Sequence, residues 1–401
     1  MQIYNEKKNC SGCSACYSIC PMHCIEMKYD YEGFSYPYVD SAQCVKCGLC
    51  AKVCPIQEEG YLEVKNSIHY AVQNKDKDIR RFSTSGGAFG VLADSIIENG
   101  GSVWGVGFDS NVKVIHKRAV NRNELADMYG SKYVQSDLND TFFQIQRELS
   151  ENKYVLFIGT PCQTEGLINY IGKNNSYLLT ADFICYGVPS PKLYMSWLRY
   201  IEKKYQKKIS KVIFRDKKYG YAGSNTKIVF QNGEVLEDRL DVKSYLKSMF
   251  IKLGLRPSCY ECRFRTSSKK CDFTLGDMWE IGKYKPELDD DKGTTHLQIH
   301  TEKGRRFFEN IMNRIEYYDV TGLVKTVSPN KQIVISIPEQ RENFFKDAVR
   351  MEYGVLMKKY LPFSRKDKIA SVVKPIIVKI PCSHVLFKTI KKIKMKKQNR
   401  M

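Results

Sequence analysis

Two short cysteine runs near the N-terminus are the clearest chemical feature of the sequence. The first, CSGCSACYSICP, and the second, CVKCGLCAKVCP, share the spacing C-x2-C-x2-C-x3-C-P, so the chain contains an internal duplication. In bacterial ferredoxins, three cysteines of such a run bind one 4Fe-4S cubane and the fourth binds the cubane of the other run. The spacing therefore predicts a two-cluster ferredoxin unit.

The duplication assigns eight cysteines to two clusters. Zinc is the alternative, but zinc modules usually separate two ligand pairs by about 12 to 20 residues. A disulfide framework would require a secreted chain. Between the runs, DYEGFSYPYVD carries a glycine and a proline among aromatics and predicts a hairpin that joins the two halves. We expect one cluster on Cys10, Cys13, Cys16 and Cys54, and the other on Cys44, Cys47, Cys50 and Cys20.

Cysteines outside the two runs predict a third cluster. Cys162 in IGTPCQ and Cys185 in FICYG each follow an expected strand, and the carboxyl ends of parallel strands share one edge of a sheet. Cys259 and Cys262 form a C-x2-C pair, a spacing that lets two thiolates bind one metal centre. We expect these four to bind a 4Fe-4S cluster, with Cys271 as a small buried residue in reserve. The alternative is core thiols at the strand ends and a C-x2-C pair that binds zinc or nothing.

Two polar turns have residue types that suit a phosphate. In RRFSTSGGAFGVL, hydroxyl side chains and glycines precede an expected helix, whose first N–H groups are free to bind an anion. In YGSKYVQSD, Lys132 could meet a phosphate or the anionic edge of a flavin ring. The alternatives are an ordinary helix N-cap and a solvated lysine on a loop. No Walker motif and no G-x-G-x-x-G after a strand occurs, so neither an ATPase nor a standard NAD site is indicated.

The elements that must position these residues alternate along the chain. Hydrophobic patterning predicts strands at 68–72, 103–108, 113–120, 154–160 and 177–187, and helices at 85–100, 140–153, 162–172 and 191–205. Such alternation is typical of a largely parallel sheet with helices packed on it. Segments at 211–217, 227–232, 273–279 and 296–301 predict an added antiparallel portion, closed by a helix over 304–315.

The expected fold is an α+β ferredoxin-like N-terminal domain followed by a larger α/β domain with a mostly parallel sheet and an added antiparallel portion. We expect the ferredoxin domain over residues 1–58 and the α/β domain, with the third cluster, over 66–335; the resemblance described below makes the latter a flavin-binding oxidoreductase domain. A helical and basic C-terminal tail would occupy 336–401.

Composition and charge limit the location and the partners. Fifteen cysteines and a polar N-terminus without an apolar signal region predict a reducing cytoplasm. Of the net charge of +20, residues 364–401 contribute twelve Lys or Arg against Asp367, which is +11 and leaves +9 for the rest. This basic tail indicates either weak association with an anionic membrane surface, at the inner membrane face, or a solubilising end. No nucleic-acid-binding module is recognised, so we expect no nucleic-acid partner.

The order of the motifs is similar to that of a known family. The twin runs joined by EGFSYP are followed by RFSTSGGAFGVL, GSKYVQSD, FIGTPCQTEGL, FICYGVPSP, a C-x2-C pair and DFTLGDMW. This combination resembles the coenzyme F-420 hydrogenase/dehydrogenase beta-subunit family from about Cys10 to the low 300s and fades beyond. The resemblance implies an FAD-containing iron–sulfur oxidoreductase that passes electrons between a deazaflavin coenzyme and a ferredoxin-like chain. Some relatives are associated with surface polysaccharide synthesis, so the family does not fix the substrate.

The resemblance also gives the two polar turns a role in binding FAD. A flavin accepts two electrons and releases them singly, whereas iron–sulfur clusters carry single electrons. We therefore expect an oxidoreductase that transfers electrons between a two-electron donor, such as reduced coenzyme F-420 or another small-molecule reductant, and the clusters. The alternative is an electron-transfer adaptor that feeds a partner enzyme in surface polysaccharide biosynthesis. Both require a redox partner protein or subunit, and no catalytic residue is indicated. The implied contacts are Ser83, Ser85, Gly86 and Gly87 for the pyrophosphate and Ser131, Lys132 and Tyr133 for the flavin.

Overall fold

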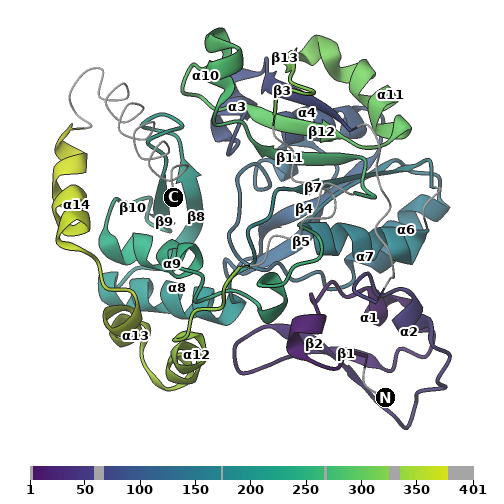
Figure 1. The fold of residues 1–401 in the computed structure, drawn as a ribbon, viewed down its shortest axis with the longest axis horizontal. Coiled ribbons are helices and arrows are strands. Elements are labelled where there is room, and N and C mark those ends of the chain that lie inside the picture. The colour runs from purple at the N-terminus through teal and green to yellow at the C-terminus, as the bar shows by residue number, and fades with distance from the viewer. Residues whose placement is uncertain (1–2, 58–66, 173–174, 266–268, 325–334, 378–401) are drawn as a thin grey trace.

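A small N-terminal unit lies against one side of a larger body (Figure 1). The computed structural model describes residues 3–57, 67–172, 175–265, 269–324 and 335–377 of the chain. The body contains an eight-stranded mixed sheet and a separate three-stranded sheet, and the N-terminal unit contains a two-stranded hairpin.

The N-terminal unit consists of two short helices around a hairpin. Its elements are α1 (Ala15–Ile19), β1 (Ile25–Tyr29), β2 (Ser35–Val39) and α2 (Leu49–Lys52), and β1 pairs antiparallel with β2. The expected hairpin between the cysteine runs is confirmed, with Gly33 in its turn at a φ of +87°.

The duplicated cysteine spacing produces a duplicated backbone geometry. Ser14 precedes α1 and Gly48 precedes α2, at equivalent positions of the two runs, and both have left-handed φ angles of 62° and 77°. Each run therefore turns sharply in the same place before its helix begins, which brings its cysteines round onto one side of the turn.

The central sheet has five strands that run in one direction and three that run the other way. The strand order is β13-β3-β12-β11-β7-β6-β4-β5. Parallel pairing joins β4, β6, β7 and β11. Strand β12 is antiparallel to both β11 and β3, so β3 runs in the same direction as these four strands. The bounds are β3 (Ile68–Asn74), β4 (Ser102–Phe108), β5 (Val114–Ala119), β6 (Val155–Ile158), β7 (Leu178–Phe183), β11 (Phe273–Asp277), β12 (Thr295–Ile299) and β13 (Ile315–Asp319).

Helices cover both faces of the central sheet. On one face, α4 (Ala88–Glu98) and α11 (Glu302–Ile311) bury their apolar sides against the strands. On the other face, α6 (Thr141–Ser150) and α7 (Pro161–Ile171) pack on β4, β6 and β7. Cys13, Ala15 and Val53 of the N-terminal unit belong to this second cluster, so the unit docks on the α6 and α7 layer (Figure 1). Short helices α3 (Lys77–Phe82), α5 (Arg122–Leu125) and α10 (Ile281–Tyr284) lie in the connections.

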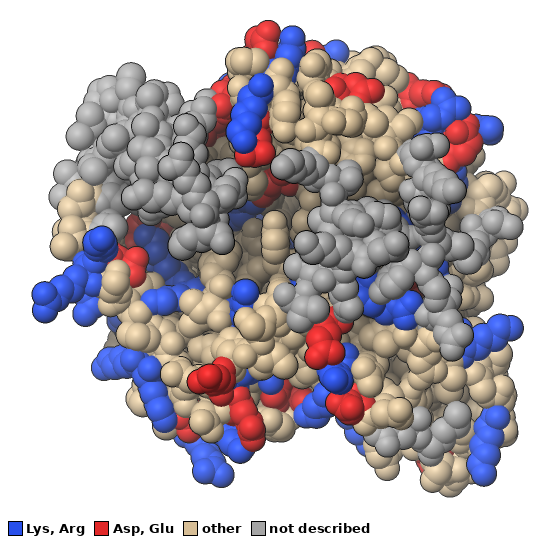
Figure 2. Space-filling view, viewed as in Figure 1, with Lys and Arg blue, Asp and Glu red and all other residues tan. Residues whose placement is uncertain are grey.

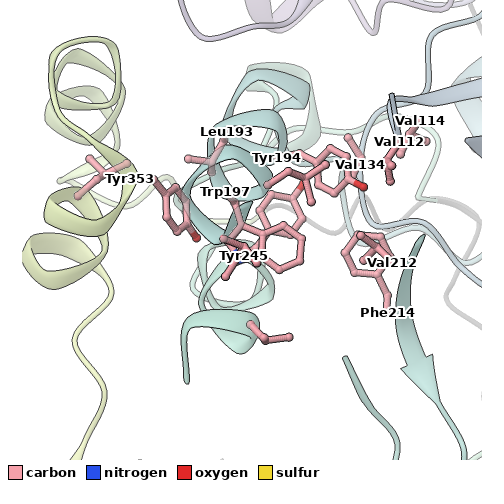
Figure 3. Packing of buried hydrophobic residues seen from close by; sticks show 14 of the residues in the cluster. Val112, Val114, Val134, Leu193, Tyr194, Trp197, Val212, Phe214, Tyr245 and Tyr353 are labelled. Carbon is pink, nitrogen blue, oxygen red and sulfur yellow. The ribbon is translucent and has the colours of Figure 1, made fainter. Parts of the chain in front are cut away.

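The three-stranded sheet forms a second lobe with its own helices. It consists of β8 (Ile209–Asp216), β9 (Asn225–Phe230) and β10 (Val235–Glu237), in the antiparallel order β10-β9-β8. Helices α8 (Pro191–Tyr205) and α9 (Leu240–Phe250) meet beside it, where Trp197 stacks on Tyr245 with ring centroids 5.2 Å apart (Figure 3). Val212 and Phe214 of β8 complete this aromatic core.

The C-terminal helices pack on the second lobe. They are α12 (Arg341–Arg350), α13 (Tyr353–Tyr360) and α14 (Arg365–Ile377). Phe344, Phe345 and Tyr353 belong to the same hydrophobic cluster as α8 and β8, and so does Phe34 of the ferredoxin hairpin. The domain boundaries expected at 1–58, 66–335 and 336–401 stay predictions, but α12 and α13 share this core with the body.

The expected fold class is confirmed, with some local differences. The segment at 273–279 contains β11, which is antiparallel to β12 as expected but also pairs in parallel with β7, so it joins the antiparallel portion to the parallel strands. The helix expected over 304–315 ends at Ile311, and Ile315 begins β13, because the alternating IEYYD suits a strand at the edge of the sheet. Helix α9 was not expected. Within the described ranges, no helix is long and apolar enough to span a membrane.

Candidate functional site

The first cysteine set of the ferredoxin unit lies at the junction with the body, where Cys13 and Cys16 are buried and Cys10 and Cys54 partly buried. Burial raises the pKa of Cys13 and of Cys16, and in both cases the nearby charges of Cys10 and Cys54 raise it further. The crossed ligand set that the spacing predicts is therefore brought together, with Cys54 of the second run beside the three cysteines of the first. Metal binding requires thiolates, so loading this set would release protons.

The second cysteine set lines a cavity at the outer end of the ferredoxin unit. The cavity wall contains Cys20, Cys44, Cys47 and Cys50, the other crossed set. Cys47 is exposed to solvent, whereas every cysteine of the first set is at least partly buried. A fifth thiol, Cys24, also lines the cavity, and its Sγ lies 3.4 Å from that of Cys20. Cys24 falls outside the run, so the spacing alone assigned it no role.

The third set comes from three separate segments of the body. Burial raises the pKa of Cys162 to about 12 and that of Cys259 to about 11, and the charge of Cys262 adds to both shifts. Burial also raises the pKa of Cys185, and Cys259 and Cys162 contribute to it. The structure thus brings together the four cysteines expected to bind a third cluster. Cys271 is buried near Thr274. This is the position expected for a small core residue.

Local structure explains how the TPCQ sequence presents Cys162. Pro161 is the first residue of α7, and the backbone N–H of Thr160 donates to Oε1 of Gln163 at 3.1 Å. Gln163 in turn donates to Ser136 Oγ at 3.1 Å, which fixes the helix start. Cys162 is therefore held in the first turn of α7, directly beyond the carboxyl end of β6. Cys185 stands just beyond β7, at the same edge of the sheet.

The first and third sets adjoin each other. The charge of Cys162 contributes to the raised pKa of Cys13, so the two thiols lie within electrostatic reach. Helix α7, which carries Cys162, packs on Cys13 at Gly166, where an added Cβ would lie 3.0 Å from the Cys13 sulfur. A larger residue would push the ferredoxin unit away. Near the C-x2-C pair, Arg263 donates to the carbonyl of Ile56, just past the second run.

The described residues contain no group of three His, Cys, Asp or Glu that converges tightly enough to hold a single metal ion. Thiols that bind a cubane attach to separate iron atoms, so they need not converge on one point.

The hydroxyl groups of the first polar turn are used within the protein. Ser83 Oγ donates to the carbonyl of Ile79 at 2.7 Å and closes α3. Ser85 Oγ donates to the carbonyl of Thr294 at 2.7 Å. Gly86 has no room for a side chain, because a Cβ would lie 2.2 Å from the carbonyl oxygen of Val72. These residues therefore shape the turn, and a phosphate there would depend on the first N–H groups of α4.

Gly87 and the second polar turn lie beside this loop. Gly87 precedes α4 with a φ of +85°, and the backbone N–H of Ser131 donates to Thr84 Oγ1 at 2.7 Å. Burial lowers the pKa of Lys132 to about 7, and the nearby Lys211 and Lys117 also lower it. Asp127 opposes them, and its carbonyl accepts a hydrogen bond from Lys132. An anionic ligand beside Lys132 would favour the charged form of this buried lysine, so the turn suits an anion.

A second cation beside this turn was not singled out from the sequence. Arg215 of β8 donates to Asp277 at 2.6 Å, and its guanidinium lies 5.1 Å and 5.2 Å from the ring centroids of Tyr221 and Trp279. Its Nη2 is buried and has no hydrogen-bond partner in the described part of the chain. Tyr133 packs edge-on against the neighbouring Phe214. Cationic and aromatic groups with a free donor fit an aromatic anion such as a flavin, and Figure 2 shows the surface hollowed between the two sheets.

Comparisons with known proteins agree with the motifs. A family model for the C-terminal part of the coenzyme F420 hydrogenase/dehydrogenase beta subunit matches residues 152–322, and a 4Fe-4S dicluster domain matches residues 9–57. An uncharacterized ferredoxin of Methanocaldococcus jannaschii is 34% identical over 55 residues, which are 14% of this chain and 70% of that protein. NADH-quinone oxidoreductase subunit I of Pelobacter propionicus is 31% identical over 58 residues, or 12% of this chain. The chain spans only 31% of the length of that protein.

A solved structure also shows similarity. A chain of the F420-reducing hydrogenase complex from Methanosarcina barkeri aligns at 15% identity, covering 76% of this chain and 94% of that chain, with a TM-score of 0.43. The dicluster match makes this protein an iron–sulfur electron-transfer protein. Over residues 152–322 the chain is related to the C-terminal part of the coenzyme F420 hydrogenase/dehydrogenase beta subunit, and it carries a 4Fe-4S dicluster ferredoxin domain at residues 9–57.

Proposed function

We propose that this protein is a flavin-dependent iron–sulfur oxidoreductase with three 4Fe-4S clusters. It transfers electrons between a two-electron donor and a redox partner protein through FAD and the clusters. Relation to a hydrogenase/dehydrogenase subunit supports the oxidoreductase class. The clusters would carry electrons singly, and the flavin would convert between paired and single electrons.

The observation that carries the proposal is the close packing of Cys13, from the first set, on α7, the helix that also carries Cys162 of the third set. A ferredoxin docked at random would leave its buried set separated from the cysteines of the body. Here Gly166 lets α7 approach the Cys13 sulfur closely, and Cys162 of the same helix adds to the raised pKa of Cys13, which is mainly due to burial. The exposed Cys47 belongs to the second set at the outer end. The three sets therefore follow one another from the sheet edge to the surface of the ferredoxin unit.

The flavin would lie between the central sheet and the second lobe. Lys132 and Arg215 supply positive charge there, while Tyr133 and Trp279 supply aromatic surface. The carboxyl ends of β4, β6 and β7 face this region, and ligands of α/β sheets gather at such ends. The same sheet edge carries Cys162 and Cys185. A flavin at this edge would lie on the side of the third set opposite the ferredoxin unit.

The proposed donor is coenzyme F-420 or another soluble two-electron reductant. The test is an anaerobic purification of the full chain, flavin identification, and a screen of reductants while flavin absorbance is followed. Bleaching by a reduced deazaflavin or pyridine nucleotide would support the enzyme. Reduction by ferredoxin alone would favour an adaptor that feeds a partner enzyme, and a chain without flavin would overturn the proposal.

The basic tail is a separate proposal and rests on sequence. Most of residues 364–401 lie outside the described part of the structure, including Cys382 and nearly all of the final lysines. Within α14, Ile369 and Val372 are exposed beside basic residues. We propose that the tail binds weakly to anionic membrane surfaces, with each Lys or Arg near the surface contributing about 1 kcal/mol.

A further inference from the structure

Arg256 lies fully buried between the first and third cysteine sets. Its relative exposure is 0%. Toward the ferredoxin unit, Nε donates to the carbonyl of Cys10 at 2.9 Å, and Nη2 donates to the carbonyl of Ser35 at 3.0 Å. Nη2 also lies 3.7 Å from the sulfur of Cys10. On the other side, Arg256 begins the segment that continues into Cys259, three residues away.

The surroundings are built to hold the guanidinium in place. Nη1 donates to Oε1 of Gln135 at 3.0 Å, and the amide nitrogen of Gln135 donates to the carbonyl of Ser11 at 3.0 Å. The ring of Tyr36 lies 4.3 Å from the guanidinium carbon. Gly12 provides the space, since its φ is +69° and an added Cβ would lie 2.8 Å from Nη1. The position of the charge is therefore fixed from several sides.

The counter-charge of Arg256 is unusual. A buried guanidinium keeps its proton, so its charge needs a buried anion nearby. No carboxylate in the described residues forms an ion pair with Arg256. Burial lowers the pKa of Arg256, but its pKa is raised on balance because Cys10, Tyr36, Cys259 and Cys162 lie near enough to stabilise its charge when they are anionic. These cysteines belong to the first and third sets.

A second buried arginine at the same junction shows the contrast. Arg341 reaches the ferredoxin hairpin from α12 and forms a two-pronged ion pair with Glu32, at 2.9 Å and 2.6 Å. Its charge is balanced by a carboxylate. The ferredoxin unit can thus be held by an arginine that is paired with a carboxylate. Docking alone therefore does not explain why Arg256 lacks such a partner.

We infer that Arg256 is the electrostatic residue that raises and links the reduction potentials of the first and third clusters. The inference rests on the proposed three-cluster function. Reduction adds one electron, and so one negative charge, to a cluster without breaking a bond, and a fixed positive charge stabilises the reduced form. Because the same charge faces both sets, both potentials rise. The two neighbouring clusters are thereby kept close in potential, which favours electron transfer in either direction.

The test uses the full chain, prepared anaerobically, with potentials measured by redox titration followed by electron paramagnetic resonance. Arg256→Gln removes the charge and keeps hydrogen-bonding capacity, whereas Arg256→Lys keeps the charge. The matched control combines Glu32→Gln with Arg341→Gln, which removes the neighbouring buried pair and leaves Arg256 intact. In Arg256→Gln we expect the reduced-to-oxidised ratio of the first and third clusters to fall about tenfold at a given applied potential. For a one-electron couple this is a lowering of the reduction potential by about 59 mV.

The pattern across clusters and variants decides the outcome. We expect the second cluster to keep its potential in Arg256→Gln, and all clusters to keep theirs in Arg256→Lys and in the control. An unchanged first cluster in Arg256→Gln would overturn the inference. Equal shifts in all three clusters, or the same shifts in the control, would also overturn it, since they would indicate a general loosening of the junction.

If an Arg256 variant fails to fold, a measurement on the unaltered protein still tests the inference. Pulsed electron paramagnetic resonance on protein with isotopically labelled arginine nitrogen should detect coupling between a guanidinium and the reduced first cluster, because Nη2 lies 3.7 Å from the Cys10 sulfur. Absence of this coupling would contradict the inference. Iron content distinguishes a failure of the three-cluster proposal from a failure of the Arg256 inference. About eight iron atoms per chain would show that no third cluster is bound. The coupling at the first cluster would still test Arg256.

Discussion

The ion pair between Glu32 and Arg341 should be the strongest single tie between the ferredoxin hairpin and the C-terminal helices. The Glu32 and Arg341 side chains are only 4% and 10% exposed, and Arg341 also donates to the carbonyl of Leu255 at 2.8 Å. Removing one partner of a buried pair leaves an uncompensated charge and costs about 3 to 5 kcal/mol. We therefore expect Glu32→Gln to weaken the junction by that amount.

Native-state hydrogen exchange, measured by mass spectrometry on the anaerobic protein, reports this loss locally. Amides of the β1–β2 hairpin and of α12 should exchange at least about 100-fold faster, since 1.4 kcal/mol corresponds to about tenfold. Replacing both partners by apolar residues, as in Glu32→Leu with Arg341→Met, should recover much of the protection.

The control is an exposed pair of similar length. Lys203 and Glu352 are 2.6 Å apart, with side chains 75% and 72% exposed. Such exposed pairs are screened by solvent and contribute little, so Glu352→Gln should hardly change exchange. Unchanged exchange in Glu32→Gln, or an equal effect of Glu352→Gln, would refute the reasoning that burial makes the first pair strong.

Three further predictions follow from the cysteine pattern, from a buried lysine and from the tail. Cys54→Ala should remove the cluster bound by the first run while the second run keeps its own, and electron paramagnetic resonance showing both clusters intact would contradict the crossed assignment. Burial lowers the pKa of Lys217 to about 7, whereas an unfolded lysine has a pKa of about 10.4. Between these pH values the unfolded state binds more protons than the folded state, so the free energy of unfolding should rise with pH. Lys217→Met should flatten this rise, and an unchanged slope in denaturation experiments would show that another group causes it. Truncation after Phe363 should abolish salt-sensitive sedimentation with anionic vesicles, whereas equal sedimentation of both forms would remove the membrane proposal.

Most of the secondary structure was predictable because its signals are local. The helix expected over 191–205 matches α8 from Pro191 to Tyr205, and the Ser190 side chain caps it by accepting from the N–H of Leu193. The strand at 103–108 lies within β4. By contrast, the parallel pairing of β11 with β7 joins segments almost a hundred positions apart, and no local pattern encodes such a partner.

The cysteine sets were predictable for the same reason, and the charged residues around them were not. The spacing within each run restricts how the eight ferredoxin cysteines group, and this signal is local. The third set was expected instead from two strand ends on one sheet edge and a C-x2-C pair, and its binding of a cluster stays a prediction. Arg256 and Arg215 look like ordinary arginines in the sequence, since only the fold buries one beside Cys10 and the other beside Trp279. The polar turn at Ser83 and Ser85 shows the opposite case. Its residue types suit a phosphate, yet tertiary contacts already use both hydroxyls.

The central claim is that the body carries a third cluster beside the ferredoxin pair. Iron and sulfide analysis of the anaerobically prepared full chain, compared with a Cys185→Ala and Cys262→Ala double variant, tests it most directly. We predict about twelve iron atoms per chain in the unaltered protein and about eight in the variant, with the two ferredoxin clusters still visible by electron paramagnetic resonance. About eight iron atoms in the unaltered protein, or the same content in both, would contradict the account.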